Sequence, residues 1–291
     1  MTEAALFPPT APPPRRVAAG LYLVSTPIGN LRDVTLRALD VLAAADLVLA
    51  EDTRVTAKLL AAYGLKAKLE RCDDHASVRA AEIAVEQVSA GGVVALVSDA
   101  GTPMVSDPGF VVARAMITRG LPVHPIPGAS SLLAALVLSG LPADRVTFVG
   151  FLPPKSAGRV GALTELKSGG QTLVFFESGP RLRSSLTDMA AVLGPRPAAV
   201  CRELTKLYET CVRGTLAQLA SDPALDAPKG EIVVVVGPGE TETASAADAD
   251  AALTEALHRL APGEAASEVS RALDLPRKAL YRRALELQGR R

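Results

Sequence analysis

Short apolar runs alternate with longer amphipathic segments through the first half of the chain, and this alternation constrains the fold most. Strands are expected at residues 21–25, 46–50, 93–97 and 122–126, with helices at 36–44, 55–63, 77–90, 110–119 and 130–139. Ser77 is the expected N-cap of the third helix. Because a helix between two strands carries the chain back across the sheet, the strands pair in parallel. We therefore predict an α/β domain over residues 20–144, with a mostly parallel sheet and helices on both faces.

The pattern changes at residue 145. The segment RVTFVGFLPP (145–154) reads as a strand that ends in paired prolines. Prolines cannot donate to a ladder, so this segment suits a crossover between domains. Strands are then expected at 172–176, 198–202, 208–214 and 231–236, with helices at 181–193 and 216–220. Fewer helices separate these strands, which predicts a second α/β domain with a mixed sheet over residues 145–240.

The two ends of the chain have compositions of their own. Residues 1–19 begin with a proline-rich stretch and are expected to form a disordered tail. Residues 241–252 are small and acidic, as in a linker. Three short helices are expected at 253–260, 265–273 and 277–287, in a small helical domain over 253–291. Residues 271–291 carry seven Lys or Arg against two acidic residues.

Composition excludes several classes of protein. The 291 residues are 48% hydrophobic with a formal net charge of zero, which is typical of a globular protein rather than a wholly basic nucleic-acid binder. The chain has no apolar run of the roughly 18–20 residues that cross a bilayer and no signal peptide, so a cytoplasmic protein is expected. Cys72, Cys201 and Cys211 lack disulfide or zinc spacing, and the three histidines lack ligand partners, so no metal is expected.

The loop SDAGTPMVSDPG, residues 98–109, follows the apolar strand VVALV. Ser98 and Asp99 fall at the carboxyl end of that strand, where open α/β sheets bind ligands. Gly101 lets the backbone approach a ligand closely. Asp107 is either the N-cap of the following helix or an acid of the site. The chain lacks the glycine patterns of dinucleotide and P-loop sites, so the loop predicts a ligand of another kind.

Three more loops follow strands of the first domain: STPIGN (25–30), EDTR (51–54) and PGASS (127–131). Each is weak evidence alone, because strand–helix junctions favour Gly, Pro, Ser and Asp. All four loops are expected to meet at one edge of the parallel sheet. We therefore predict a pocket at that edge.

Eight motifs occur in an order that resembles one family. They are STPIGNLRDVTLRAL, EDTR, SDAGTPMVSDPG, PGASS, GFLPPK, ESGPRL, CRELTKLYE and KGEIVVVVG, between residues 21 and 239. The chain closely resembles the bacterial small-subunit ribosomal RNA cytidine 2′-O-methyltransferases of the tetrapyrrole methylase superfamily. The resemblance implies a two-domain fold, S-adenosylmethionine in the cleft between the lobes, ribosomal RNA as substrate, a small helical C-terminal domain and a homodimer.

The resemblance also implies which residues bind the methyl donor. In the first lobe they are Pro27, Ser98, Asp99, Ala100, Gly101, Thr102, Ser130 and Ser131. In the second lobe they are Phe176, Glu177 and Gly230.

A ribose hydroxyl is a poor nucleophile, so a base or a cation near the developing alkoxide would help. The candidates near the predicted cleft are Glu51, Asp52, Asp107, Glu177, Glu203, Lys206 and Lys229. We favour Lys229 or Lys206 for electrostatic stabilisation and a carboxylate, Glu51 or Asp107, for proton acceptance. The alternative for Glu177 and Glu203 is a structural ion pair with Arg181 or Arg202.

RNA binding requires cations along the cleft. Several lie in or beside the motif loops, and the favoured RNA contacts are Arg32, Arg54, Lys155, Arg181 and Arg202; Arg159, Lys167, Arg183 and Lys206 are further candidates. The C-terminal helices have helix-turn-helix spacing and either dock RNA or only pack. Two other functions stay open: a small-molecule methylase of the tetrapyrrole type, and a nucleic-acid-binding regulator.

Overall fold

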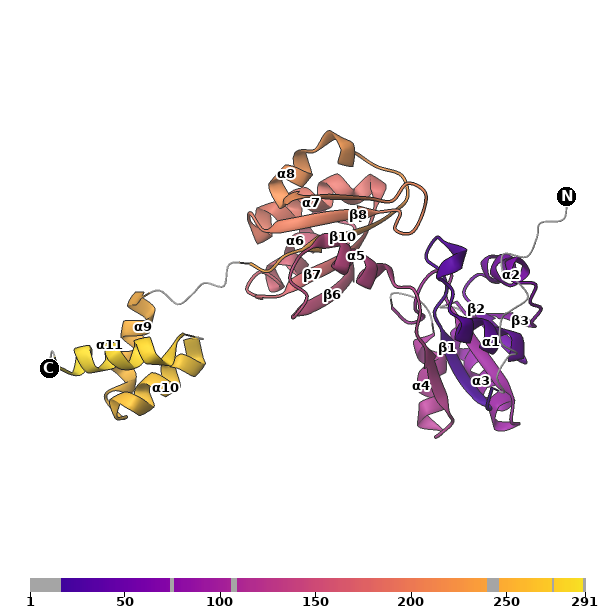
Figure 1. Ribbon diagram of the computed structural model, residues 1–291, viewed down its shortest axis with the longest axis horizontal. Helices are drawn as coiled ribbons and strands as arrows, with labels where there is room; N and C mark the ends of the chain where they lie inside the picture. The colour runs from indigo at the N-terminus through magenta and orange to yellow at the C-terminus, as the bar shows by residue number, and fades with distance from the viewer. Residues whose placement is uncertain (1–16, 74–75, 106–108, 240–245, 274, 290–291) are drawn as a thin grey trace.

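A computed structural model describes residues 17–73, 76–105, 109–239, 246–273 and 275–289 (Figure 1). Most of the expected N-terminal tail, and Asp107, lie outside these residues. Figure 1 shows two α/β lobes and a separate helical unit near the C-terminus. Among the described residues, no helix is long and apolar enough to span a membrane.

The first lobe is built on a parallel sheet in the order β3-β2-β4-β1-β5. Its strands are β1 (Gly20–Val24), β2 (Leu47–Ala50), β3 (Leu69–Arg71), β4 (Val93–Val97) and β5 (Val123–Ile126). All five residues of the central strand β4 are buried, as a strand covered on both faces requires.

Helices cover both faces of this sheet. One hydrophobic cluster joins it to α3 (Ser77–Ser89) and α4 (Phe110–Thr118), and another joins it to α1 (Leu36–Ala44) and α2 (Thr53–Ala62). The predicted doubly covered parallel sheet is therefore confirmed.

The second lobe contains a mixed sheet in the order β6-β7-β10-β8-β9. Its strands are β6 (Val146–Phe151), β7 (Thr172–Ser178), β8 (Pro197–Arg202), β9 (Thr210–Thr215) and β10 (Glu231–Val236). Only the β6–β7 pair is parallel, so the prediction of a mixed sheet is also confirmed.

The helices of the second lobe cover one face of its sheet, and a helix from the first half of the chain covers the other. The first face carries α6 (Ser156–Glu165), α7 (Gly179–Leu193), α8 (Leu216–Ser221) and the 3₁₀ turn η2 (Pro223–Leu225). The opposite face packs against α5 (Ser131–Ser139) through Ala135 and Leu136. In the sequence this helix falls within the predicted first domain, yet its apolar side packs into the hydrophobic core of the second lobe.

Three local expectations fail for identifiable reasons. The strand β3 went unpredicted because it has only three residues, two of them charged. The helix α6 went unpredicted because Gly158 and Gly161 weaken its helical pattern. Ser77 is not an N-cap: it is the first residue of α3 and is buried, while the preceding Ala76 donates its N–H to the Asp73 carboxylate at 2.9 Å.

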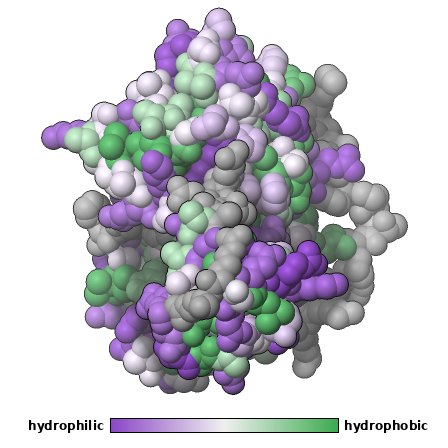
Figure 2. Space-filling model, turned by 90° about the vertical axis from the view of Figure 1, so that its left-hand side faces the viewer, coloured by the Kyte–Doolittle hydropathy of each residue, from purple (hydrophilic) through white to green (hydrophobic). Residues whose placement is uncertain are grey.

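The C-terminal unit consists of α9 (Ala246–Ala256), α10 (Pro262–Leu273) and α11 (Arg277–Gly289). Leu253, Val269 and Leu280 are buried in its own small core. The first helix begins inside the expected linker because its alanines favour helix and Asp248 stands in its first turn. On the face that Figure 2 shows, hydrophobic residues form small groups between hydrophilic ones.

Candidate active site

The four predicted loops do meet at one edge of the first sheet. In the parallel register, Val97 pairs with both Val24 and Ala50, so Ser25, Glu51 and Ser98 follow neighbouring strand ends. The loop after β5 joins them, because Thr102 Oγ1 donates to the Ala129 carbonyl at 3.4 Å. The predicted convergence is therefore confirmed.

A short bridge ties the first and third loops together. The N–H of Thr26 donates to the Gly101 carbonyl at 2.9 Å, and the Gly101 N–H donates to the Thr26 carbonyl at 3.1 Å. The Thr26 hydroxyl donates to the Ser98 carbonyl at 3.1 Å, and the hydroxyls of Ser25 and Thr102 lie 3.0 Å apart. Gly101 has a φ of +88°, a conformation that glycine adopts without strain. These bonds hold the SDAGTP backbone in one conformation.

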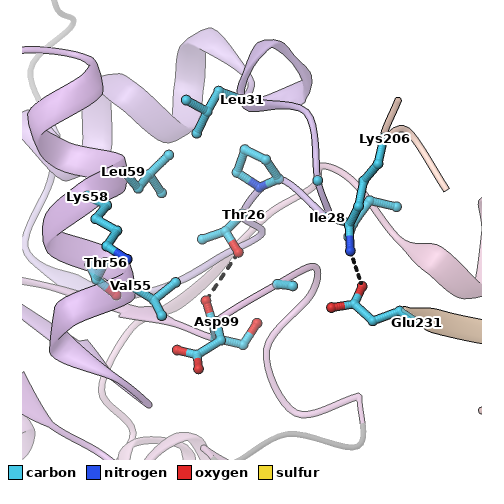
Figure 3. Close-up of a pocket in the computed structure, with 14 residues that line it drawn as sticks. Thr26, Ile28, Leu31, Val55, Thr56, Lys58, Leu59, Asp99, Lys206 and Glu231 are labelled. Carbon is cyan, nitrogen blue, oxygen red and sulfur yellow. Dashed lines mark hydrogen bonds and ion pairs between the residues drawn. The ribbon is translucent and has the colours of Figure 1, made fainter. Parts of the chain in front are cut away.

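Two cavities adjoin this loop. The first, here called the α2 cavity, has a volume of about 300 Å³ (Figure 3). Its lining is Thr26, Pro27, Ile28, Gly29, Leu31, Val55, Thr56, Lys58, Leu59, Ser98, Asp99, Ala100, Lys206 and Glu231.

The second, here called the β10 cavity, has a volume of about 250 Å³. Its lining is Ile28, Ala100, Ser131, Phe151, Phe176, Glu177, Leu204, Glu231, Ile232 and Val233. Ile28, Ala100 and Glu231 line both cavities, so the two spaces share a wall. Both lobes contribute to each cavity.

The residues expected to bind the donor divide between these cavities. Pro27, Ser98 and Asp99 line the α2 cavity, Ser131, Phe176 and Glu177 line the β10 cavity, and Ala100 lines both. Gly101, Thr102 and Ser130 line neither cavity. Gly101 and Thr102 belong to the hydrogen-bonded loops, and Ser130 is the N-cap of α5. Gly230 has a φ of +101° and no side chain, and the Glu203 carboxyl group occupies the space where a Cβ at this position would lie. A direct donor contact for each of these residues stays a prediction.

Asp99 is held by the adjacent EDTR loop. Its Oδ1 accepts the N–H of Asp52 at 3.0 Å, and its own N–H points to Glu51 Oε2 at 3.5 Å. Asp52 caps α2 and pairs with Arg54, whose hydrogen bonds hold the pKa of the Asp52 carboxyl well below its usual range. The loop therefore orients Asp99, while Glu51 lines a third, carboxylate-rich cavity that Asp99 also lines.

Lys206 brings a positive charge to the α2 cavity. Its Nζ lies 2.9 Å from Glu203 Oε1. It also lies 3.2 Å from Glu231 Oε2 (Figure 3). Burial lowers the pKa of Lys206, but the hydrogen bonds and charges of Glu203 and Glu231 outweigh it, so the pKa is raised above its ordinary value. The ammonium is therefore protonated at neutral pH. It can stabilise negative charge but cannot accept a proton.

The other predicted catalytic residues lie elsewhere. Lys229 is exposed, lines neither cavity, and accepts a hydrogen bond at its carbonyl from Arg202 Nη1 at 3.4 Å. Asp107 lies outside the described residues. Glu177 is buried and accepts from the Ser185 hydroxyl at 2.5 Å, and the expected ion pair with Arg181 is present, with Nε at 3.3 Å.

The cationic residues predicted to bind RNA divide into two exposed side chains and three that make hydrogen bonds or ion pairs within the protein. Arg32 and Lys155 are exposed at the protein surface. Arg54 pairs with Asp52, Arg181 donates to the Leu152 carbonyl at 2.6 Å, and Arg202 donates to Thr210 Oγ1 at 3.3 Å. The expectation for Arg159 is wrong. It is buried and paired with Asp188 at 2.8 Å, because α6 packs it against α7.

The cavities also contain residues that the motif argument did not single out. Leu31, Val55, Lys58 and Leu59 come from η1 (Leu31–Asp33) and α2, where they read as ordinary helix residues. Glu231 starts the apolar run EIVVVV and reads only as a strand boundary. Within the described ranges, no three His, Cys, Asp or Glu side chains form a group that could hold a metal ion.

Comparison with known proteins agrees with this geometry. Residues 20–220 match the family model for Tetrapyrrole (Corrin/Porphyrin) Methylases, and residues 243–288 match the RsmI C-terminal HTH domain. The Ribosomal RNA small subunit methyltransferase I of Mesorhizobium japonicum is 48% identical over 95% of both chains. The protein of the same name from Escherichia coli O157:H7 is 42% identical over 92% of this chain and 96% of its own.

Solved structures show the same fold at lower identity. The cobalt precorrin-4 methyltransferase of cobalamin biosynthesis superposes with a TM-score of 0.55 at 20% identity, over 75% of this chain and 94% of its own. The methyltransferase CobJ gives a TM-score of 0.57 at 19% identity, over 76% and 94%. The chain belongs to the tetrapyrrole methylase family, and it is a methyltransferase whose methyl donor is S-adenosylmethionine.

Proposed function

We propose that this enzyme methylates a cytidine ribose 2′-oxygen in small-subunit ribosomal RNA. The observation that carries the proposal is the pair of adjoining cavities, which together offer room for a donor and an acceptor next to each other. The names of relatives that span nearly the whole chain support the RNA substrate. The predicted catalytic and RNA-binding assignments remain part of this proposal.

The β10 cavity suits the adenosine part of the donor. Its lining combines apolar side chains with Ser131 and an aromatic pair, Phe151 and Phe176, whose ring centres lie 5.6 Å apart. Ala100 presents only a methyl group where the two cavities meet, so the residues present fit this group. When bound, S-adenosylmethionine supplies an electrophilic methyl group.

The α2 cavity is then the acceptor side. Methyl transfer requires the acceptor oxygen on the side of the methyl carbon opposite to sulfur. Holding the two groups in this orientation can lower the activation free energy by about 7–11 kcal/mol. Lys206 lines this cavity and offsets the charge that grows on the ribose oxygen. The predicted proton acceptors stay Glu51, which lines the separate carboxylate-rich cavity, and Asp107.

The C-terminal helices are proposed to dock RNA. Lys278 and Arg282 are exposed one turn apart on α11. Deletion of residues 241–291 separates this function from the regulator alternative: a methyltransferase keeps its donor affinity and loses RNA affinity, whereas a regulator loses all function.

A homodimer in the cytoplasm completes the proposal. Ile117 on α4 and Val137 on α5 are 66% and 78% exposed. Apolar side chains that a partner subunit would cover are exposed in this way in a single chain. Sedimentation velocity is expected to give twice the monomer mass.

The direct test supplies labelled donor with purified 30S subunits, 50S subunits or a tetrapyrrole precursor. We expect label in the RNA of the 30S subunit alone. Transfer to the tetrapyrrole instead would establish the small-molecule alternative.

A further inference from the structure

The α2 cavity has one apolar wall and two cationic edges. Leu31, Val55 and Leu59 form the apolar wall from η1 and α2, and Figure 3 shows them on the side of the cavity away from Lys206. Leu31 and Val55 are 39% and 38% exposed, so the wall is open to a ligand. An apolar surface beside a catalytic loop suits the flat face of a ring.

The cations stand at opposite edges. Lys58 extends from α2, and Lys206 reaches in from the second lobe (Figure 3). Lys206 is paired with Glu203 and Glu231, whereas Lys58 is an exposed side chain beside the opening. A phosphate next to a bound ring would therefore contact Lys58 rather than Lys206.

The polar groups at the base of the cavity match a ribose and a pyrimidine. The Glu231 carboxylate can accept hydrogen bonds from hydroxyl or amino groups, and cytosine offers an exocyclic amino donor. The volume of about 300 Å³ is at the lower end of small-ligand sites, room for one nucleoside.

A base inside an RNA helix cannot reach this space, because both lobes line it. Enzymes that act on a nucleotide within such a pocket take that nucleotide out of its stack. RNA loops already contain unstacked nucleotides that can enter such a pocket.

We propose that the α2 cavity holds one unstacked pyrimidine nucleotide of the RNA substrate, with its base against Leu31, Val55 and Leu59 and its phosphate at Lys58. This inference rests on the proposed function, since it specifies the acceptor side of that reaction. The bound ribose then lies beside Ala100, at the wall shared with the β10 cavity.

The first test fills the cavity. Val55→Trp places an indole on the apolar wall, and Ala57→Trp places one on the exposed opposite face of α2 as a matched control. Val55→Trp is expected to lose more than about tenfold in kcat/KM on 30S subunits with donor Kd changed less than about twofold. Full activity of Val55→Trp, or loss of donor binding, would overturn the proposal.

The second test removes the cation. Lys58→Ala is expected to weaken RNA binding and to lower the slope of log K against log salt concentration by about 0.7. The control Lys66→Ala changes an exposed lysine beyond α2 and is expected to leave both the affinity and the slope unchanged. An unchanged slope in Lys58→Ala contradicts the phosphate contact.

A third measurement does not depend on activity or on the variants. Cytidine monophosphate, added to methyl-labelled protein with S-adenosylhomocysteine, is expected to shift the methyl signals of Leu31, Val55 and Leu59. Absence of shifts there, or shifts at Ile232 and Val233 alone, would overturn the proposal. If the wild-type enzyme labels no RNA, the proposed function fails, and these shifts still decide whether the cavity binds a nucleotide.

Discussion

The side chain of Lys206 in the second lobe packs directly on the backbone of Gly29 in the first. A methyl group on Gly29 would lie 2.9 Å from Lys206 Cε and 3.1 Å from its Cδ. The glycine at this position therefore allows the charged end of Lys206 to reach the α2 cavity. Gly29 and Lys206 join the two lobes at the site.

The first prediction follows from this packing. Gly29→Ala is expected to push Lys206 aside and to lower kcat by up to about 100-fold, the scale of a 1 Å misplacement. Steady-state kinetics on 30S subunits and calorimetry with the donor measure the change. Gly161→Ala, in the open middle of α6, serves as control and leaves kcat unchanged. Wild-type kcat in Gly29→Ala would show that Lys206 need not hold this position.

The charge of Lys206 is the second prediction. Lys206→Met is expected to reduce kcat by about 100- to 1,000-fold, as for loss of one preorganised group that stabilises developing charge. Lys206→Arg retains the charge and is expected to restore part of the rate. Comparable activity of Lys206→Met and wild type would assign the residue to structure alone.

The raised pKa of Lys206 adds a pH dependence. A raised folded-state pKa stabilises the fold fully below the ordinary value of 10.5, and this contribution is lost as pH rises through the folded value. The difference in unfolding free energy between wild type and Lys206→Met is therefore expected to stay constant up to about pH 10 and to shrink above it. Urea denaturation over this range measures it. A difference that shrinks near neutral pH would contradict a protonated Lys206.

Asp99 gives a prediction about the donor. Asp99→Ala is expected to weaken S-adenosylmethionine binding by about 10- to 100-fold, the scale of a lost hydrogen bond to a charged group. Asp144→Ala, an exposed carboxylate between the lobes, is the control for loss of charge. Isothermal calorimetry measures both variants, and unchanged affinity in Asp99→Ala would remove this residue from the donor site.

The ion pair of Arg159 and Asp188 predicts a stability effect. Arg159 is 4% exposed, and its Nη1 also donates to the Pro154 carbonyl at 2.8 Å. Asp188→Ala leaves this guanidinium without its charge partner and is expected to cost about 3–5 kcal/mol of unfolding free energy. Arg159→Met combined with Asp188→Leu is expected to recover most of it. An equal loss in the double variant would point to packing rather than charge.

The parallel character of the first sheet and the position of the site followed from sequence because both rest on local patterns. Strands β1, β2, β4 and β5 each combine an apolar run with a polar loop, and parallel strands bring such loops to one edge. Asp99 was singled out for this reason, whereas Ala100 and Ser131 came from the family resemblance, and all three line the cavities. The place of Lys206 at the α2 cavity agrees with its choice as a candidate cation.

The remaining features depend on contacts that no local pattern encodes. Leu31 and Val55 face the cavity only because η1 and α2 flank it in three dimensions. Lys229 resembled a site residue in the motif KGEIVVVVG, but its side chain is exposed and its carbonyl meets Arg202. Arg159 had the sequence context of a surface cation, and only the packing of α6 on α7 buries it.

The most direct measurement identifies the methylated nucleoside. Small-subunit RNA from cells that lack this enzyme is treated with wild-type protein and donor, digested to nucleosides and analysed by mass spectrometry. One new 2′-O-methylcytidine is expected, with the neighbouring phosphodiester resistant to alkali. A methyl group on a base, on another nucleoside, or on no part of the RNA would contradict it.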